Sequence, residues 1–190
     1  MKKFKAAVIG CGRAGSFFDI EDKRKVISSH CGAYKECPET DLISICDKDK
    51  RKLDDSSKYW GVNKTYLSYE DLLNSERIDI LSVCTLPEDH LKVIQFAADE
   101  GVKAIYCEKP ITKSLSEAKE VIKICKENNI LLTINHQRRW NSQFIDLKNK
   151  IEKKEFGEIQ HINFYYTRGV YNSGSHLFDL MRMLFGEVDR

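Results

Sequence analysis

Short apolar runs recur along the first 135 residues of the chain, and several of them end in turn residues or shortly before a proline. Runs of this length, rich in Val, Ile and Leu, are typical of strands that are buried on both faces of a parallel sheet. The predicted strands are residues 5–9, 42–46, 78–85, 103–107 and 130–135.

Helical patterns separate these runs. A serine followed three residues later by an acid has the shape of a capping box, and it occurs at Ser68 with Asp71 and at Ser114 with Glu117. Residues 88–100 form a third helical pattern, which stops at a glycine. The apolar residues at helical spacing after Ser114 are Leu115, Ala118, Val121, Ile122 and Cys125. Alternating strands and helices predict an α/β fold, a Rossmann-type doubly wound parallel sheet.

The pattern changes near residue 135. A polar helix-like stretch covers residues 141–154, and a further helix is expected over Ser175–Phe185. Between them residues 159–166, "IQHINFYY", alternate apolar and polar side chains, as a half-exposed antiparallel strand does. The sequence therefore predicts one doubly wound domain over residues 1–135 and the start of a second, α+β domain over residues 136–190.

Composition and charge narrow the function classes. The chain has 31 basic and 29 acidic residues, so no excess of positive charge favours a nucleic-acid surface. It has no run of eighteen apolar residues, and we therefore expect no membrane contact. Its seven cysteines form no C-x-x-C pair, so we expect buried thiols in a reducing compartment, a cytoplasmic location and no metal site.

A glycine-rich loop, G-x-G-x-x-G, directly follows the first predicted strand and precedes a plausible helix. In this context Gly10 permits a tight turn, Gly12 lets the backbone approach a pyrophosphate, and Gly15 allows close helix–strand packing. We predict that the loop, including Arg13 and Ala14, binds a dinucleotide; the alternative is an ordinary glycine turn.

An acid stands at the end of the second predicted strand, where dinucleotide-binding folds bind the adenosine ribose. Asp47 lies 32 residues beyond Gly15, more than the usual spacing of about 20, because a charged insertion precedes the next helix. A carboxylate there repels a 2′-phosphate and favours NAD over NADP, although Lys48, Lys50 and Arg51 weaken the preference. The alternative is that Asp47 is a solvated turn residue.

The stretch "CEKPIT", residues 107–112, ends the fourth predicted strand with a charged pair and a proline. Proline cannot continue a central strand, so Glu108 and Lys109 stand at the carboxyl end of the sheet. In open α/β sheets, ligands bind at that edge.

With these motifs the chain resembles the glucose–fructose oxidoreductase, inositol dehydrogenase and rhizopine-catabolism family, Gfo/Idh/MocA. The matching stretches are "VIGCGRAG", "ICD", "TLPEDH", "CEKPIT", "NHQRRWN" and "YNSGSHLFDLMRMLFGEV". The resemblance implies a Rossmann domain followed by a domain with a large open antiparallel sheet. It also implies a nicotinamide cofactor and a sugar, cyclitol or nucleotide-sugar substrate.

The resemblance assigns catalytic roles to two residues. Lys109 matches the family's active-site lysine, and a cation beside the reacting hydroxyl would stabilise developing alkoxide charge. His176 matches the catalytic histidine, which would accept and pass on the hydroxyl proton. Many members carry aspartate where this chain has Asn172, which can bind a hydroxyl but cannot act as a base. Asp179, three residues after His176, is expected to orient the helix or the ring.

The same resemblance places Thr85, Pro87, His90 and Glu108 on the cofactor side of the site. Arg138, Arg139 and Trp140 match a segment between the domains and are expected to contact substrate; a solvated basic turn with a packed tryptophan is an equal alternative.

The predicted activity is hydride transfer between NAD(H) and a secondary hydroxyl of a small-molecule polyol or nucleotide sugar. The alternative is a non-catalytic NAD-binding protein or an inactive truncated remnant. The family's open sheet needs more strands than the one at residues 159–166. Either the chain is a fragment, or it is a truncated product, or another chain completes the strand; we expect homo-oligomers through this region.

Overall fold

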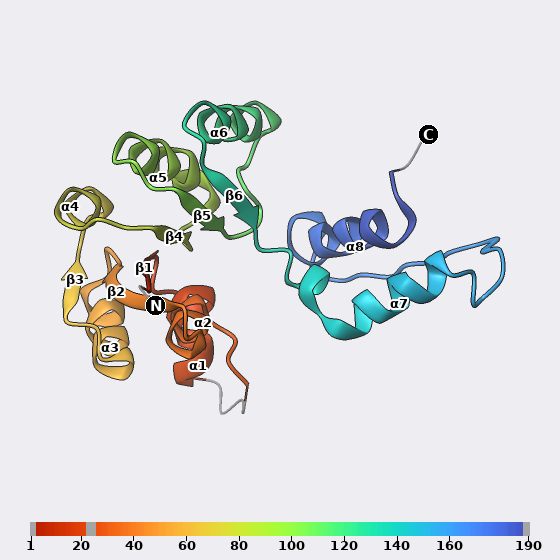
Figure 1. Ribbon diagram of the computed structural model, residues 1–190, viewed down its shortest axis with the longest axis horizontal. Coiled ribbons are helices and arrows are strands. Elements are labelled where there is room, and N and C mark those ends of the chain that lie inside the picture. The colour runs from red at the N-terminus through yellow and green to blue at the C-terminus, as the bar shows by residue number, and fades with distance from the viewer. Residues whose placement is uncertain (1–2, 22–25, 188–190) are drawn as a thin grey trace. The chain divides into compact units, whose positions relative to one another are not determined.

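The computed structural model describes residues 3–21 and 26–187. The chain divides into two compact units, Met1–Ile134 and Asn135–Arg190 (Figure 1).

The first unit is built on one six-stranded sheet in which all paired strands are parallel, in the order β3-β2-β1-β4-β5-β6. The strand order reverses between β1 and β4, which creates the switch point where ligands of doubly wound folds bind. The strands are β1 Phe4–Ile9, β2 Thr40–Cys46, β3 Lys64–Tyr66, β4 Ile80–Val83, β5 Ala104–Cys107 and β6 Leu131–Ile134. The predicted α/β class is confirmed; among the six strands of the sheet, only the three-residue β3 was missed, because it is too short to show a period.

Helices cover the sheet and connect its strands. Ser68 and Ser114 accept hydrogen bonds from the backbone N–H groups of Asp71 and Glu117, at 3.1 and 3.2 Å, so both predicted caps form. Gly101 ends its helix with a φ of +77°. The helical segments are η1 Arg13–Phe17, α1 Phe18–Glu21, α2 His30–Glu36, α3 Lys50–Trp60, α4 Tyr69–Ser75, α5 Pro87–Asp99 and α6 Leu115–Glu127.

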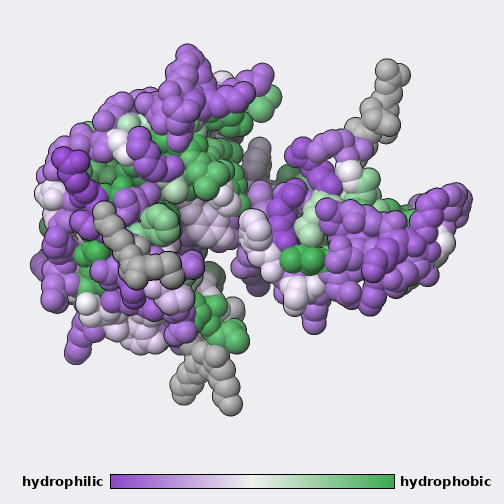
Figure 2. Space-filling model, viewed as in Figure 1, coloured by the Kyte–Doolittle hydropathy of each residue, from purple (hydrophilic) through white to green (hydrophobic). Residues whose placement is uncertain are grey.

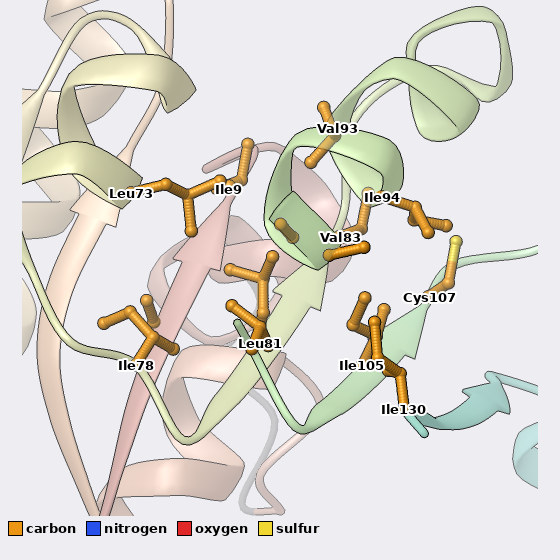
Figure 3. Packing of buried hydrophobic residues seen from close by; sticks show 14 of the residues in the cluster. Ile9, Leu73, Ile78, Leu81, Val83, Val93, Ile94, Ile105, Cys107 and Ile130 are labelled. Atoms are coloured by element: carbon orange, nitrogen blue, oxygen red, sulfur yellow. The ribbon is translucent and has the colours of Figure 1, made fainter. Parts of the chain in front are cut away.

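The core of the first unit consists of two apolar clusters. One joins the sheet to α4, α5 and α6 and includes Leu81, Ile94 and Ile105, which Figure 3 shows packed together. The other joins the sheet to α2 and α3 and includes Val8 and Leu53. Because consecutive strand residues point to opposite faces, one strand feeds both clusters, and helices cover both faces of the sheet.

One predicted helical face is only partly correct. Val121 and Cys125 of α6 are buried, but Leu115 and Ile122 are 72% and 52% exposed. With 3.6 residues per turn, these two side chains lie on a flank of the helix, away from the buried stripe. Leu131 of the edge strand β6 is also 70% exposed.

The second unit is helical as far as the structure describes it. Its elements are η2 Gln137–Trp140, α7 Ser142–Glu152, η3 Val170–Gly174 and α8 Ser175–Phe185. The two helices predicted here are confirmed. Its buried apolar side chains among the described residues are Leu177, Leu180 and Leu184 of α8. No residue of α7 is buried, and Figure 2 shows its visible surface as mainly hydrophilic.

The strand predicted over residues 159–166 is wrong for the described chain, which has no strand there. A strand needs a neighbour that pairs with its backbone N–H and C=O groups, and alternation of side chains alone does not supply one. Tyr165 in this segment is 90% exposed. Nowhere in residues 3–21 and 26–187 is a helix both long and apolar enough to cross a membrane.

Candidate functional site

The three glycines of the loop between β1 and η1 differ in how much room each has for a side chain. Gly10 has a φ of +98°, and a Cβ there would lie 2.5 Å from the backbone carbonyl of Cys84. A Cβ on Gly15 would collide with the carbonyl oxygen of Gly10. A Cβ on Gly12 would meet no atom within 4 Å. The fold itself therefore requires glycine at positions 10 and 15, whereas position 12 opens onto free space.

That space belongs to a cavity of about 610 Å³ at the carboxyl ends of β1, β2 and β4. Its location is the switch point of the sheet, where the strand order reverses. The predicted site residues that line the cavity are Gly10, Gly12, Arg13, Asp47 and Thr85.

Other predicted cofactor-side residues lie outside the lining within the described chain. Ala14 and Gly15 belong to the helical turn after the loop, and Pro87 is the first residue of α5. Their positions support the loop and the helix rather than the cavity wall.

Asp47 follows β2, and backbone groups hold both of its carboxylate oxygens. Oδ2 accepts from the N–H of Cys11 at 2.7 Å, and Oδ1 accepts from the N–H of Asp49 at 2.8 Å. The first bond ties the end of β2 to the glycine loop, 36 residues away in the chain. The carboxylate is therefore fixed in the cavity wall rather than loose in a solvated turn.

Sequence reasoning missed a further wall of the cavity. The missed strand β3 leads into the start of α4, and the side chains that it brings to the cavity include Leu67, Ser68 and Tyr69. Lys48 and Lys52 add positive charge beside Asp47. Only the cap at Ser68 gave a signal in the sequence, and it indicated a helix start rather than a lining residue.

Glu108 and Lys109 follow β5 as predicted. The N–H of Glu108 donates to the carbonyl of Val83 at 2.9 Å, which extends the β4–β5 ladder by one bond. The Glu108 side chain is 14% exposed, and its Oε1 lies 3.1 Å from Nε2 of His30. Its Oε2 accepts from the backbone N–H of Lys109 at 3.2 Å. The carboxylate thus braces the backbone that carries the lysine.

A buried series of hydrogen bonds connects Glu108 to helix α2. His30 Nδ1 lies 2.8 Å from Oγ of Ser82, and the hydroxyl of Tyr34 lies 2.8 Å from the same oxygen. Neither His30 nor Ser82 was predicted as a site residue, because 52 and 78 residues separate His30 from its partners in the sequence.

His90 is fully buried at the start of α5. Its Nδ1 lies 3.0 Å from the carbonyl oxygen of Ile111, and its Nε2 lies 3.2 Å from that of Thr85. The ring therefore links the loop after β4 to the loop after β5, which contains Lys109.

The thiols near the cavity are poor nucleophiles. Burial, and then the charge of Asp47, raises the pKa of the Cys11 thiol to about 12. Burial, and then Cys11 and Asp47, raises the pKa of Cys46 to about 12. Burial, and then Glu108, also raises the pKa of Cys84 and Cys107. These thiols stay protonated at neutral pH, so they act as small apolar side chains. All seven cysteines are free.

The second unit carries the other predicted residues. His176 is half-buried in the first turn of α8, Asn172 is exposed in η3, and Arg138 is half-buried in η2. Oγ of Ser175 donates to the carbonyl of Asn172 at 2.8 Å, which joins η3 to α8.

Asp179 forms an ion pair with Arg139, which stands beside Arg138 in the predicted segment between the domains. Nε of Arg139 lies 2.8 Å from each oxygen of Asp179. Nδ1 of His136 lies 3.8 Å from the same carboxylate, and the His136 ring meets the His176 ring edge-on at 6.0 Å. Among the described residues, no group of three or more His, Cys, Asp or Glu is placed to hold a metal ion.

Comparison with known proteins identifies the family to which the first unit belongs. The model of the Gfo/Idh/MocA oxidoreductase family, NAD-binding Rossmann fold, matches residues 4–136. D-apiose dehydrogenase of Paraburkholderia graminis is 25% identical over 207 residues, which cover 100% of this chain and 52% of that protein. The chain spans about half the length of the curated relatives that it matches along its whole length.

Solved structures share the fold. The WlbA dehydrogenase from Bordetella pertussis, in complex with NADH and UDP-GlcNAcA, aligns with a TM-score of 0.82 at 24% identity, covering 98% of this chain and 60% of that one. Myo-inositol 2-dehydrogenase from Lactobacillus plantarum aligns with a TM-score of 0.81 at 22% identity, covering 97% and 57%. The family model, the parallel sheet and the glycine loop agree, and the chain belongs to the Gfo/Idh/MocA family of oxidoreductases with an NAD-binding Rossmann domain.

Proposed function

We propose that the protein is an NAD-dependent dehydrogenase that oxidises or reduces a secondary hydroxyl of a sugar, cyclitol or nucleotide sugar. The observation that carries the proposal is that the glycine loop, Asp47 and Lys109 all stand at the same edge of the sheet. The glycine loop, Asp47 and Thr85 line one cavity after β1, β2 and β4, and Lys109 follows the adjacent strand β5. A dinucleotide held by its pyrophosphate and adenosine ribose would extend its nicotinamide along this edge.

Oxidation of a secondary hydroxyl needs a positive charge beside the hydroxyl oxygen and an acceptor for its proton. The bound nicotinamide would supply the hydride acceptor or donor. The ammonium of Lys109 would stabilise the developing alkoxide, and the imidazole of His176 would take up the proton. Asn172 and Arg138 would hold neighbouring hydroxyls by hydrogen bonds.

The substrate class follows from relatives of known activity. Proteins similar to this chain include D-apiose dehydrogenase and the myo-inositol 2-dehydrogenase of Thermotoga maritima. Both names refer to polyhydroxylated compounds, and the WlbA structure contains UDP-GlcNAcA. We infer a polyol or nucleotide-sugar substrate on this likeness.

The preference for NAD over NADP rests on Asp47. Its fixed carboxylate in the cavity wall would accept a ribose hydroxyl and repel a 2′-phosphate. Asp47→Ser removes the repulsion and leaves Lys48 and Lys52, so it should narrow or invert the ratio of NADH to NADPH affinity. Tighter binding of NADPH by the unmodified chain would contradict this assignment.

The activity is tested by NADH titration followed by a screen of NAD reduction with hexoses, inositols and nucleotide sugars. With an active substrate, Lys109→Met should lower turnover about a hundredfold or more, because one electrostatic group is lost, while NADH affinity barely changes. His176→Ala should likewise lower turnover and leave NADH affinity nearly unchanged. Asn172→Ala should lower turnover by a smaller factor. Normal turnover of Lys109→Met with lost NADH affinity would make Lys109 a cofactor clamp instead.

A second candidate is a non-catalytic NAD-binding protein. The residues that line the cavity all belong to the first unit, so NADH could bind there without Asn172, His176 or any other residue of the second unit. Tight NADH binding without turnover on the whole screen would support it.

Two further proposals concern assembly and location. Residues 159–166 leave Ile162 and Tyr166 each 41% exposed, so we infer self-association through this segment. A monodisperse monomer at tens of micromolar in light scattering would count against it. Seven free cysteines fit a reducing compartment, and we propose a cytoplasmic location.

A further inference from the structure

His30 begins helix α2, and the segment before it is fixed by one carboxylate. Asp19 accepts hydrogen bonds from the N–H groups of Ser28 and Ser29, at 2.7 and 3.0 Å. The hydroxyl of Ser29 donates to Asp19 and accepts from the N–H of Gly32, which caps α2. The charged insertion that lengthened the spacing to Asp47 thus ends in a well-defined helix start, and the first residue of that helix points into the domain.

From this position His30 crosses to the carboxyl end of β5. Ser82 of β4 lies on one side of the ring, at 2.8 Å from Nδ1, and Glu108 lies on the other, at 3.1 Å from Nε2. The ring of Tyr106 packs against the imidazole at a centroid distance of 4.8 Å and a tilt of 41°. Ser82 of β4, Tyr106 of β5 and Glu108 directly after β5 therefore fix both the plane and the direction of the imidazole.

The hydrogen bonds that connect Glu108, through His30 and Ser82, to Tyr34 each have a definite donor and acceptor. A carboxylate only accepts, so Nε2 of His30 carries a proton and donates to Glu108. In the neutral ring Nδ1 then accepts from Ser82, whose oxygen can accept from the hydroxyl of Tyr34. Burial raises the pKa of Tyr34, which keeps its phenol protonated and able to donate.

These hydrogen bonds are strengthened by the burial of the residues that form them. His30 and Ser82 are 5% and 0% exposed, and the Glu108 side chain is 14% exposed. In such surroundings a hydrogen bond to a charged group is stronger than in water, and a carboxylate that loses its donor is left poorly solvated. Glu108 without His30 would therefore turn toward water and away from its present position.

We propose that His30 is a positioning residue for the nicotinamide end of the site, acting by holding the carboxylate of Glu108 in place. This inference rests on the proposed function, because it assumes that Glu108 meets the bound cofactor. The same carboxylate accepts from the N–H of Lys109, so the constraint extends to the backbone of the lysine. His30 itself does not line the cavity, so it would act on the cofactor only through Glu108.

The test uses three substitutions at one position in the full chain, with NADH as the probe. His30→Gln places its amide nitrogen near the present Nε2 and keeps a donor for Glu108. His30→Asn places its amide near Nδ1 and keeps only the contact with Ser82. His30→Phe keeps the ring shape and removes both contacts. The NADH dissociation constant is measured by fluorescence, and circular dichroism checks that each variant is folded.

We expect His30→Phe and His30→Asn to raise the NADH dissociation constant about tenfold, the scale of one lost hydrogen bond to a charged group. His30→Gln should stay within about threefold of the unmodified chain. In the double variant with Glu108→Gln, the effect of His30→Phe should vanish, because the carboxylate that it positions is gone. A merely structural role would give equal effects in both backgrounds.

Two results separate the possible failures. If the unmodified chain does not bind NADH, both the proposed function and this inference are overturned. If it binds NADH and His30→Asn binds as tightly as His30→Gln, the inference alone fails. This Asn–Gln comparison decides the matter even if His30→Phe does not fold.

Discussion

The two units of the chain differ in how many apolar side chains they bury. In the first, strands and helices bury apolar side chains on both faces of a six-stranded sheet. In the second, the buried apolar side chains within the described residues are three leucines of α8, and α7 buries none of its side chains. A dinucleotide site needs only one sheet edge, so the first unit contains its cavity whole.

The second unit contains a strand-like pattern of side chains that has no pairing strand among the described residues. Residues 159–166 have the alternation of a strand, but the structure gives no strand among them. The exposed apolar side chains of this segment would be covered only by a further strand or by another chain. The difference teaches that the cavity is formed within the first unit alone, whereas the proposed proton acceptor, His176, belongs to the second unit.

The largest expected difference is in stability. Leu81 is fully buried in the central strand β4, and Leu81→Ala should lower the free energy of unfolding of the first unit by about 2–5 kcal/mol. Leu180→Ala makes the same deletion in α8 and should leave that transition unchanged. Each unit has one tryptophan, so urea unfolding in a Trp140→Phe background reports on Trp60 alone. Equal shifts by both variants would mean that the units unfold together.

Alkaline pH should destabilise the first unit through its buried thiols, because all seven cysteines lie between residues 11 and 125. The pKa of Cys11 rises from an ordinary value of 9.0 to about 12 in the folded chain. Above pH 9 the unfolded chain loses a proton that the folded chain keeps, so stability is complete below pH 9 and falls up to about pH 12.

Each such thiol should remove about 1 kcal/mol between pH 9 and 10. Cys11→Ala should make the fall in stability shallower, whereas Cys37→Ala, at a half-buried site, serves as the matched control. A pH dependence that is identical in both variants would show that the buried thiols are not its cause.

The smallest expected effect is that of removing the second unit. A fragment of residues 1–135 should keep a thermal midpoint within about 4 °C of the full chain, since a loss below about 1 kcal/mol is expected. Limited proteolysis of the full chain should cut first beyond residue 135. Early cleavage within residues 75–110, which contain the central strands β4 and β5, would contradict the independence of the first unit.

Much of the first unit could be predicted from local signals. The glycine loop, the caps at Ser68 and Ser114 and the apolar runs each depend on a few neighbouring residues, and each was found where expected. Features that depend on distant residues were missed. Strand β3 has three residues and is defined by its pairing with β2, and His30 meets Glu108 across 78 residues.

The second unit was harder to predict for a related reason. Its helices follow from local periodicity and were found, but a strand is defined by a neighbour that the described chain does not provide. The ion pair of Arg139 with Asp179 spans 40 residues; the sequence pointed to each residue for a different role and did not predict their pairing.

The central claim is that the glycine loop binds the dinucleotide, and Gly12→Ala tests it most directly. Gly12 has a φ of −71°, which alanine adopts readily, and the added methyl meets no protein atom within 4 Å. The thermal midpoint should therefore be equal or slightly higher. NADH titration should show saturable binding to the unmodified chain and a loss of at least about tenfold in affinity for the variant, because the methyl occupies the space of the pyrophosphate. Unchanged NADH affinity of a folded Gly12→Ala protein would contradict the account.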